Sequence, residues 1–151
     1  MGNLPYNVSS QIILSILESN IQYEHCIFLI QKELAQRFYP ETKSSKISLI
    51  AEFFSDFEIL FDIPPEAFYP EPKVTSSLVK IKKHGRHIEK KKDYIAFKRI
   101  LSLCFANPRK KISNPLKNIF NVMPKFSFDI NCRPEELEIH NYFEILSKYE
   151  E

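Results

Sequence analysis

Hydrophobic and polar residues in the first half of the chain follow patterns typical of both helices and strands. In residues 9–19 apolar side chains recur with helical spacing, and Ser9 or Ser10 is placed to cap that helix. A continuous apolar run at residues 26–30 is typical of a buried parallel strand. The remaining patterned segments predict two helices and two strands, at residues 32–38, 46–54, 58–63 and 77–82.

The second half has a different pattern. Gly85 marks the expected boundary, and the apolar spacing beyond it predicts three helices at about residues 92–106, 111–121 and 134–149. We therefore expect an α/β domain at residues 1–84 and a small all-helical domain at residues 85–151. A proline-rich loop, rigid because proline fixes φ, joins the last two predicted strands of the first domain.

Composition narrows the class of protein. No apolar stretch approaches the roughly 20 residues that cross a bilayer, and the N-terminus lacks the layout of a secretory signal. Cys26, Cys104 and Cys132 are odd in number and widely spaced, which predicts reduced, packed thiols rather than disulfides or metal ligands. We expect a cytoplasmic protein with neither a membrane nor a metal partner.

The charge is strongly segregated along the chain. Residues 73–125 contain fifteen Lys or Arg and two acidic residues, a formal charge of +13, whereas the rest carries −11. Such segregation is typical of a surface that binds a polyanion. The stretch 80–92 is equally consistent with RNA contact and with a solvated linker. Arg109, Lys110 and Lys111 cluster where a helix is expected to begin, and there the pattern favours contact with RNA phosphates.

The start of the chain carries the most specific chemistry. The exocyclic amine of adenine is a poor nucleophile until acceptors on its N–H groups aim the nitrogen lone pair at a methyl donor. Asn3 offers a side-chain carbonyl, and the backbone carbonyl of Leu4 or Pro5 offers a second acceptor. Tyr6 offers a flat face for an unstacked base. Taken alone, the tetrapeptide is also compatible with an ordinary turn.

Longer segments give these residues a family context. Residues 3–9, 31–37, 61–74, 76–81, 105–116 and 133–137, taken in order, resemble the motifs of the ribosomal RNA adenine N6,N6-dimethyltransferase family (KsgA type). The resemblance covers almost the whole chain. It implies the C-terminal part of a Rossmann-like, S-adenosylmethionine-dependent methyltransferase domain, the catalytic domain at residues 1–84, followed by a helical RNA-binding domain at residues 85–151.

The resemblance also assigns roles to individual residues. Asn3, Leu4, Pro5 and Tyr6 correspond to the catalytic loop, with Asn3 also against the cofactor, and Phe68 faces the catalytic tyrosine across the flipped adenine. Tyr69 is the neighbouring alternative to Phe68, which is also compatible with a core position. The implied function is dimethylation of adenines in small-subunit (16S) ribosomal RNA, with that RNA or a 30S precursor as partner.

The sequence departs from the family pattern at three places. Its only glycines are Gly2 and Gly85, so it has no glycine-rich loop for S-adenosylmethionine. Met1 is therefore expected to be an internal start within a longer reading frame. The basic motif is reduced, and Pro115 interrupts a predicted helix. Two alternatives follow: a non-catalytic RNA-binding or ribosome-assembly module, and a DNA adenine N6-methyltransferase.

Overall fold

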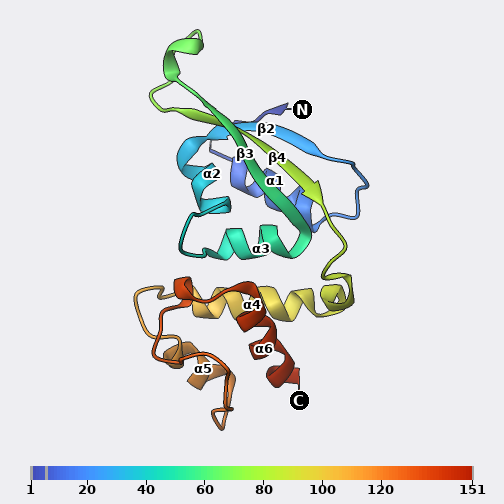
Figure 1. The fold of residues 1–151 in the computed structure, drawn as a ribbon, viewed down its shortest axis with the longest axis vertical. Helices are drawn as coiled ribbons and strands as arrows, with labels where there is room; N and C mark the ends of the chain where they lie inside the picture. The colour runs from blue at the N-terminus through green and yellow to red at the C-terminus, as the bar shows by residue number, and fades with distance from the viewer. Residues whose placement is uncertain (1, 6, 151) are drawn as a thin grey trace.

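The computed structural model describes residues 2–5 and 7–150, with the backbone alone for residues 88–90 and 150. The chain forms an α/β layer followed by a helical layer (Figure 1). The first layer contains β1 (Gly2–Asn3), α1 (Ser9–Glu18), β2 (Cys26–Gln31), α2 (Lys32–Phe38), α3 (Lys46–Phe54), β3 (Ser55–Ile63) and β4 (Ser76–Lys83). The second contains α4 (Tyr94–Cys104), α5 (Ser113–Ile119) and α6 (Ile139–Glu150).

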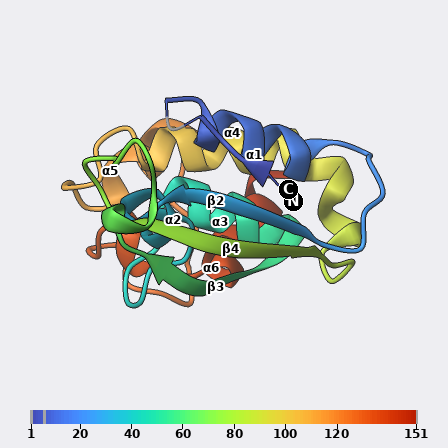
Figure 2. The same cartoon turned by 90° about the horizontal axis from the view of Figure 1, so that it is seen from above.

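The four strands form one mixed sheet in the order β1-β2-β4-β3. β1 pairs parallel with β2, whereas β4 runs antiparallel to both β2 and β3. The expectation of a parallel strand at residues 26–30 is thus correct for one edge of β2 and wrong for the other. Seen from above, the strands lie side by side beneath α1 (Figure 2).

A continuous hydrophobic core joins the two layers. α3 lies between the sheet and the helical layer (Figure 1), and its Phe53 ring contacts Phe97 of α4 and Phe143 of α6 at centroid distances of 5.0 and 6.0 Å. A polar connection adds to this packing, because the Ser44 backbone N–H donates to the Glu135 carbonyl at 2.9 Å. The helical layer is therefore fixed against the sheet by both apolar and polar contacts.

The predicted helices of the second half are present but shorter than expected. The last begins at Ile139 rather than at residue 134, because Pro134–Glu136 forms a separate 3-10 turn before it. Pro115 lies in the first turn of α5. Backbone N–H groups there have no hydrogen-bond partner within the helix, so the N–H that proline lacks is not missed. Across the described residues, no helix is long and apolar enough to cross a membrane.

Candidate functional site

Two loops that are far apart in sequence leave the sheet at the same end, the one formed by the carboxyl ends of β1 and β2. Asn3 pairs with Leu29 near the carboxyl end of the parallel strands β1 and β2. At the end of β2, Gln31 pairs with Ser76, the first residue of β4. The loop that follows β1 and the hairpin loop between β3 and β4 therefore flank one edge, which is where α/β proteins commonly bind ligands.

Hydrogen bonds fix the backbone of the loop after β1. The Leu4 N–H donates to the Leu29 carbonyl at 3.4 Å, which extends the ladder by one residue. The Pro5 carbonyl accepts two bonds, from the Val8 N–H at 3.3 Å and from the Ser9 hydroxyl at 2.6 Å. A carbonyl has two lone pairs, so the Pro5 oxygen is fully used. No donor from the described residues reaches the Leu4 carbonyl.

This geometry corrects one prediction and resolves another. Ser9 and Ser10 do not cap α1, because both lie inside the helix; the N-cap is Val8, which makes no side-chain cap. The hydroxyl of Ser9, a fully buried residue, instead turns back to the Pro5 carbonyl. Of the two carbonyls considered from sequence, Leu4 is the one that no donor of the described residues occupies. Tyr6, the predicted stacking residue, lies outside the described residues.

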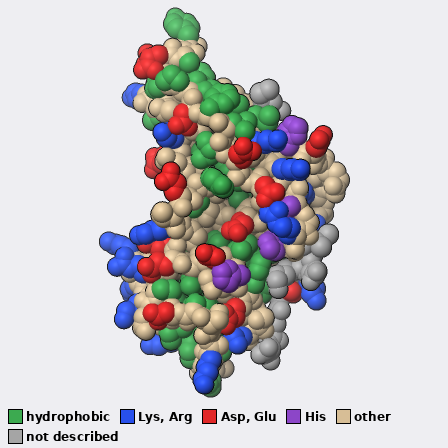
Figure 3. Space-filling model, viewed as in Figure 1, with side chains coloured by type: hydrophobic (Ala, Val, Ile, Leu, Met, Phe, Trp, Pro, Cys, Tyr) green, Lys and Arg blue, Asp and Glu red, His purple; other side chains and the backbone are tan. Residues whose placement is uncertain are grey.

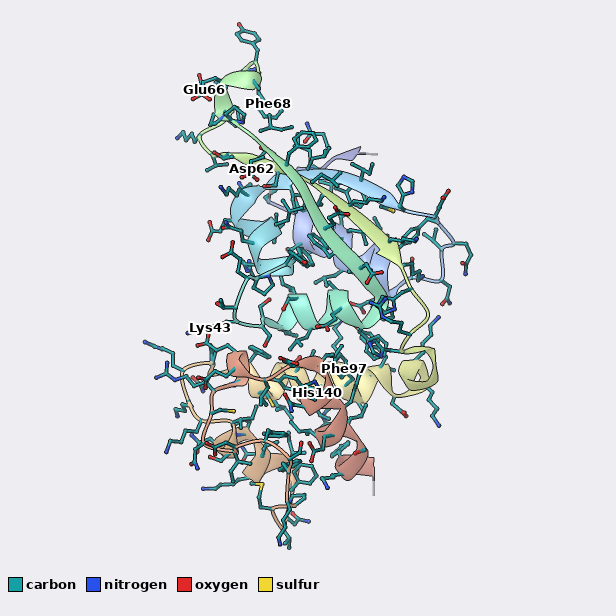
Figure 4. All side chains as sticks on the ribbon, in the orientation of Figure 1. Lys43, Asp62, Glu66, Phe68, Phe97 and His140 are labelled. Atoms are coloured by element: carbon teal, nitrogen blue, oxygen red, sulfur yellow. The ribbon has the colours of Figure 1, made fainter. Side chains whose placement is uncertain are left out.

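Phe68 lies at the far end of the β3–β4 hairpin (Figure 4). It follows a 3-10 turn at Pro65–Ala67, and its N–H donates to the Pro65 carbonyl at 3.2 Å. The Phe68 side chain is half-buried, whereas that of its neighbour Tyr69 is fully exposed. Phe68 is therefore not a core residue, and its ring is presented by a short, hydrogen-bonded turn.

A polar cluster at the base of this hairpin had no counterpart in the sequence analysis. The Asp62 carboxylate accepts a hydrogen bond from the Ser77 hydroxyl at 2.6 Å and forms an ion pair with Lys32 at 2.9 Å (Figure 4 labels Asp62). These contacts, the Ser77 bond first, hold the pKa of Asp62 below its usual value. The cluster joins β3, β4 and the start of α2 beside the candidate site.

Arg109, Lys110 and Lys111 occupy the loop between α4 and α5, and all three are exposed. Figure 3 shows Lys and Arg side chains gathered at the left of the helical layer, on the side where this loop lies in Figure 1. They directly precede α5 rather than begin it, so the expected use of the helix N-terminus to hold phosphates is not met, and their contact with RNA stays a prediction. α5 begins at Ser113, and the Ile112 and Ser113 N–H groups donate to the carbonyls of Cys132 and Ile130. The backbone N–H groups at the start of α5 are therefore already occupied and are not available to a phosphate.

A cavity of about 530 Å³ lies between α3 and residues 135–138. Most of its charged lining is acidic, and burial together with the nearby Glu138 raises the pKa of Glu52. Such a lining disfavours RNA. No group of three or more potential metal ligands occurs within the described residues.

Comparison with known proteins decides the family. Residues 1–149 match the family described as ribosomal RNA adenine dimethylase. The chain belongs to this family. Within the adenine dimethylase family, the chain is 36% identical to ribosomal RNA small subunit methyltransferase A of Aliarcobacter butzleri, over 98% of this chain and 58% of that protein. It is 35% identical to the protein of the same name from Francisella tularensis, over 94% of this chain and 56% of that protein.

Solved structures support the same fold. The dimethyladenosine transferase of Plasmodium falciparum superposes with a TM-score of 0.81 at 18% identity, covering 98% of this chain and 65% of that one. The 23S rRNA methyltransferase ErmE superposes with a TM-score of 0.73 at 14% identity, covering 99% of this chain and 64% of that one. The predicted family and fold class are thus confirmed. The dimethylase chain spans less than two thirds of the length of these relatives.

Methyltransferases of this kind generally use S-adenosylmethionine. The described residues fit one edge of such a site. Asn3 is exposed at the carboxyl end of β1, where its amide is available to a ligand. Gly2 does not provide a close backbone approach, because a Cβ at this position would meet the Phe28 ring at an ordinary 3.5 Å.

Proposed function

We propose that this chain carries the catalytic loop and the RNA-binding part of an enzyme that dimethylates N6 of adenines in small-subunit ribosomal RNA. The observation that carries the proposal is the loop after β1, where an exposed Asn3 precedes the Leu4 carbonyl, which accepts no hydrogen bond from the described residues. The family match over residues 1–149 supports the same reaction. S-adenosylmethionine, when bound, supplies the methyl group.

The loop geometry accounts for activation of the amine. One N–H of the adenine amine donates to the side-chain carbonyl of Asn3 and the other to the backbone carbonyl of Leu4. The Pro5 carbonyl takes no part, since the Val8 N–H and the Ser9 hydroxyl already occupy it. These acceptors are held in place before substrate arrives, so little reorganisation is needed as positive charge develops on nitrogen.

Phe68 and Tyr6 hold the base in this proposal. The hairpin loop that carries Phe68 leaves the sheet at the same edge as the catalytic loop. A half-buried ring on a proline-rich turn loses little conformational entropy when it stacks on a base. Stacking of one base on an aromatic side chain contributes about 1–3 kcal/mol, enough to stabilise an adenine outside its helix.

The helical layer, residues 85–151, holds the RNA, and the α/β layer, residues 1–84, performs the chemistry. Exposed Arg109, Lys110 and Lys111 contact phosphates of a small-subunit RNA or of a 30S precursor in the cytoplasm. Side chains that contact phosphate position an RNA without reading its sequence. The choice of adenine then depends on the two loops that leave the carboxyl end of the sheet.

The test is methyl transfer from S-adenosylmethionine to small subunits that lack the modification, by the full enzyme that contains this chain, since the chain alone is expected to be inactive. N6,N6-dimethyladenosine is measured by mass spectrometry. Removal of one preorganised polar group commonly lowers turnover by about a hundredfold to a thousandfold, so Asn3→Ala should show a loss of that order. Asn121→Ala, at an exposed position in the helical layer, is the matched control and should retain full activity.

Two other functions correspond to distinct outcomes of that test. Among the described residues, we assign only Asn3 to cofactor contact. A chain with so little of a cofactor site could bind RNA without catalysis, so an RNA-binding or ribosome-assembly module is the second candidate. RNA binding without detectable binding of S-adenosylmethionine or methyl transfer would establish that role instead. Preferential methylation of duplex DNA would identify a DNA adenine N6-methyltransferase.

A further inference from the structure

A second cavity, of about 310 Å³, lies at the opposite end of the sheet from the catalytic loop. It is formed by the chain after α1, by two rings of α3 and by the chain that leaves β4. Its described lining consists of basic, aromatic and amide side chains with one glycine: Asn20, Gln22, Tyr23, Phe53, Phe54, Lys83, His84, Gly85, His87 and Lys91. These lining residues include no carboxylate, so the charge of this cavity is opposite to that of the acidic cavity of about 530 Å³.

The positive charges of this cavity are held in place. The Lys83 ammonium donates to the carbonyls of Ser19 at 2.9 Å and Ile21 at 3.4 Å. Lys91 donates to the side-chain carbonyl of Asn20 at 3.0 Å. An ammonium group has three N–H donors, so each lysine keeps donor capacity beyond these bonds. Two positioned ammonium groups in one cavity favour an anionic ligand.

The same cavity contains a polar atom that the fold does not satisfy. The Tyr23 hydroxyl is buried and finds no hydrogen-bond partner among the described residues. Leaving such a group unpaired costs about 1–3 kcal/mol, and a ligand that accepts or donates a bond there recovers that cost. The Tyr23 ring lies 5.4 Å from the Lys83 ammonium. Phe53 and Phe54 belong to the core and border the cavity only through small exposed parts of their rings, 3% and 7%.

We propose that this cavity binds one nucleotide of single-stranded RNA, with the base against the half-buried ring of Tyr23 and the phosphate at Lys83 and Lys91. A base supplies both a flat face and edge groups that pair with the Tyr23 hydroxyl, and the phosphate supplies the anion. The cavity is within the size range of small-ligand sites, about 300–1,000 Å³. The RNA identity of the ligand rests on the proposed function.

The position of the cavity relates it to the catalytic loop. α1 begins next to that loop and ends two residues before Asn20 of the cavity. A ten-residue helix is about 15 Å long, so the two sites lie near the two ends of the same helix. The cavity would thus hold a nucleotide that flanks the target adenine in the same RNA. It also assigns a binding role to Lys83 and Lys91, within the basic segment that the sequence left undecided.

The experiment titrates the full chain with adenosine monophosphate and follows backbone amide resonances by NMR. We expect saturable shifts at Tyr23, His84 and Gly85. Tyr23→Phe keeps the ring and removes only the hydroxyl, and should weaken binding about fivefold, the equivalent of one neutral hydrogen bond. Lys91→Gln should also weaken binding and lower its salt dependence. Lys125→Gln, an exposed lysine outside the cavity, is the matched control and should change neither.

The proposal is overturned if the nucleotide shifts only resonances of residues 109–111, if it shifts none, or if Tyr23→Phe binds as tightly as the parent chain. Unchanged amide spectra of the free variants show that each has folded. Because this titration needs no methyl transfer, saturable binding here, together with a full enzyme that transfers no methyl group, would retain the site and reject the proposed function. Methyl transfer without the shifts would do the reverse.

Discussion

Ser9 links the fold of the catalytic loop to its proposed chemistry, and its replacement by alanine gives a measurable prediction. Ser9→Ala removes a buried donor 2.6 Å from the Pro5 carbonyl. A hydrogen bond of this kind contributes about 0.5–1.5 kcal/mol net. The Pro5 carbonyl keeps its bond from the Val8 N–H at 3.3 Å, so the acceptor is not orphaned and the larger penalty does not apply. We expect a loss of about 1 kcal/mol in the free energy of unfolding.

A second substitution separates this role from helix capping. If Ser9 capped α1, Ser9→Asn would be nearly neutral, because asparagine is as good an N-cap as serine. Ser9 is 0% exposed, and a larger amide in its place overpacks the site at a cost of about 1–3 kcal/mol. The structure therefore predicts the stability order serine, alanine, asparagine. Capping predicts that serine and asparagine are equal and that alanine is worse.

Urea denaturation followed by circular dichroism measures these differences. For a slope of about 2 kcal/mol/M, a loss of 1 kcal/mol lowers the midpoint by about 0.5 M. Ser10→Ala is the matched control, because Ser10 lies within α1 and makes no cap; its effect should stay within about 0.5 kcal/mol. An asparagine variant as stable as the parent chain, or an alanine variant without any loss, would refute the assignment of Ser9 to Pro5.

Three further predictions follow from other contacts. Simultaneous replacement of residues 109–111 by glutamine should weaken RNA binding and reduce the slope of log affinity against log salt by about 0.7 per lost single-strand phosphate contact, without changing the urea midpoint; an unchanged slope would place the RNA elsewhere. Ser77→Ala should raise the pKa of Asp62, read by NMR titration of its carboxyl carbon. Because the pKa of Asp62 is depressed in the folded state, its stabilisation is complete above the unfolded value near 3.9 and is lost as the pH falls through the folded value, so the variant should lose less stability on acidification. Burial raises the pKa of Cys104 to about 12, so alkylation at pH 8 should leave this thiol unmodified until the protein unfolds; rapid labelling of the native chain, detected by peptide mass, would contradict that burial.

Local patterns predicted the secondary structure where neighbours in sequence decide it. The helices Lys32–Phe38 and Lys46–Phe54 have the predicted bounds, because their apolar residues face one core at helical spacing. Strand pairing was less accessible, since the partners of β4 come from segments far apart in sequence. The last helix starts late for a local reason. The Arg133 N–H donates to the Glu136 carboxylate at 2.6 Å, which stabilises a separate turn there.

The candidate site also contains residues that a short motif reveals and contacts that only the tertiary structure reveals. A short motif was enough to find Asn3 and Leu4, whose chemistry depends on adjacent positions. The choice between the Leu4 and Pro5 carbonyls required the structure, because a serine four residues after Pro5 occupies one of them. The contacts of Asp62 with Lys32 and Ser77 join three separate elements and carry no short sequence signal. The pairing of β4 with both β3 and β2 brings them together.

The register of β4 therefore determines the position of Phe68 as well as the stability of the core. Val79 and Ile81 are fully buried, and alternate with Lys80 and Lys82, which pair across the strands with Glu58 and Asp56. A one-residue slip would turn both lysines into the core and both apolar residues out, so this register is strongly selected. The same pairing fixes the two ends of the hairpin that carries Phe68. The position of Phe68, the ring proposed to stack on adenine, is consequently fixed by β4, whose alternating pattern allows one stable register.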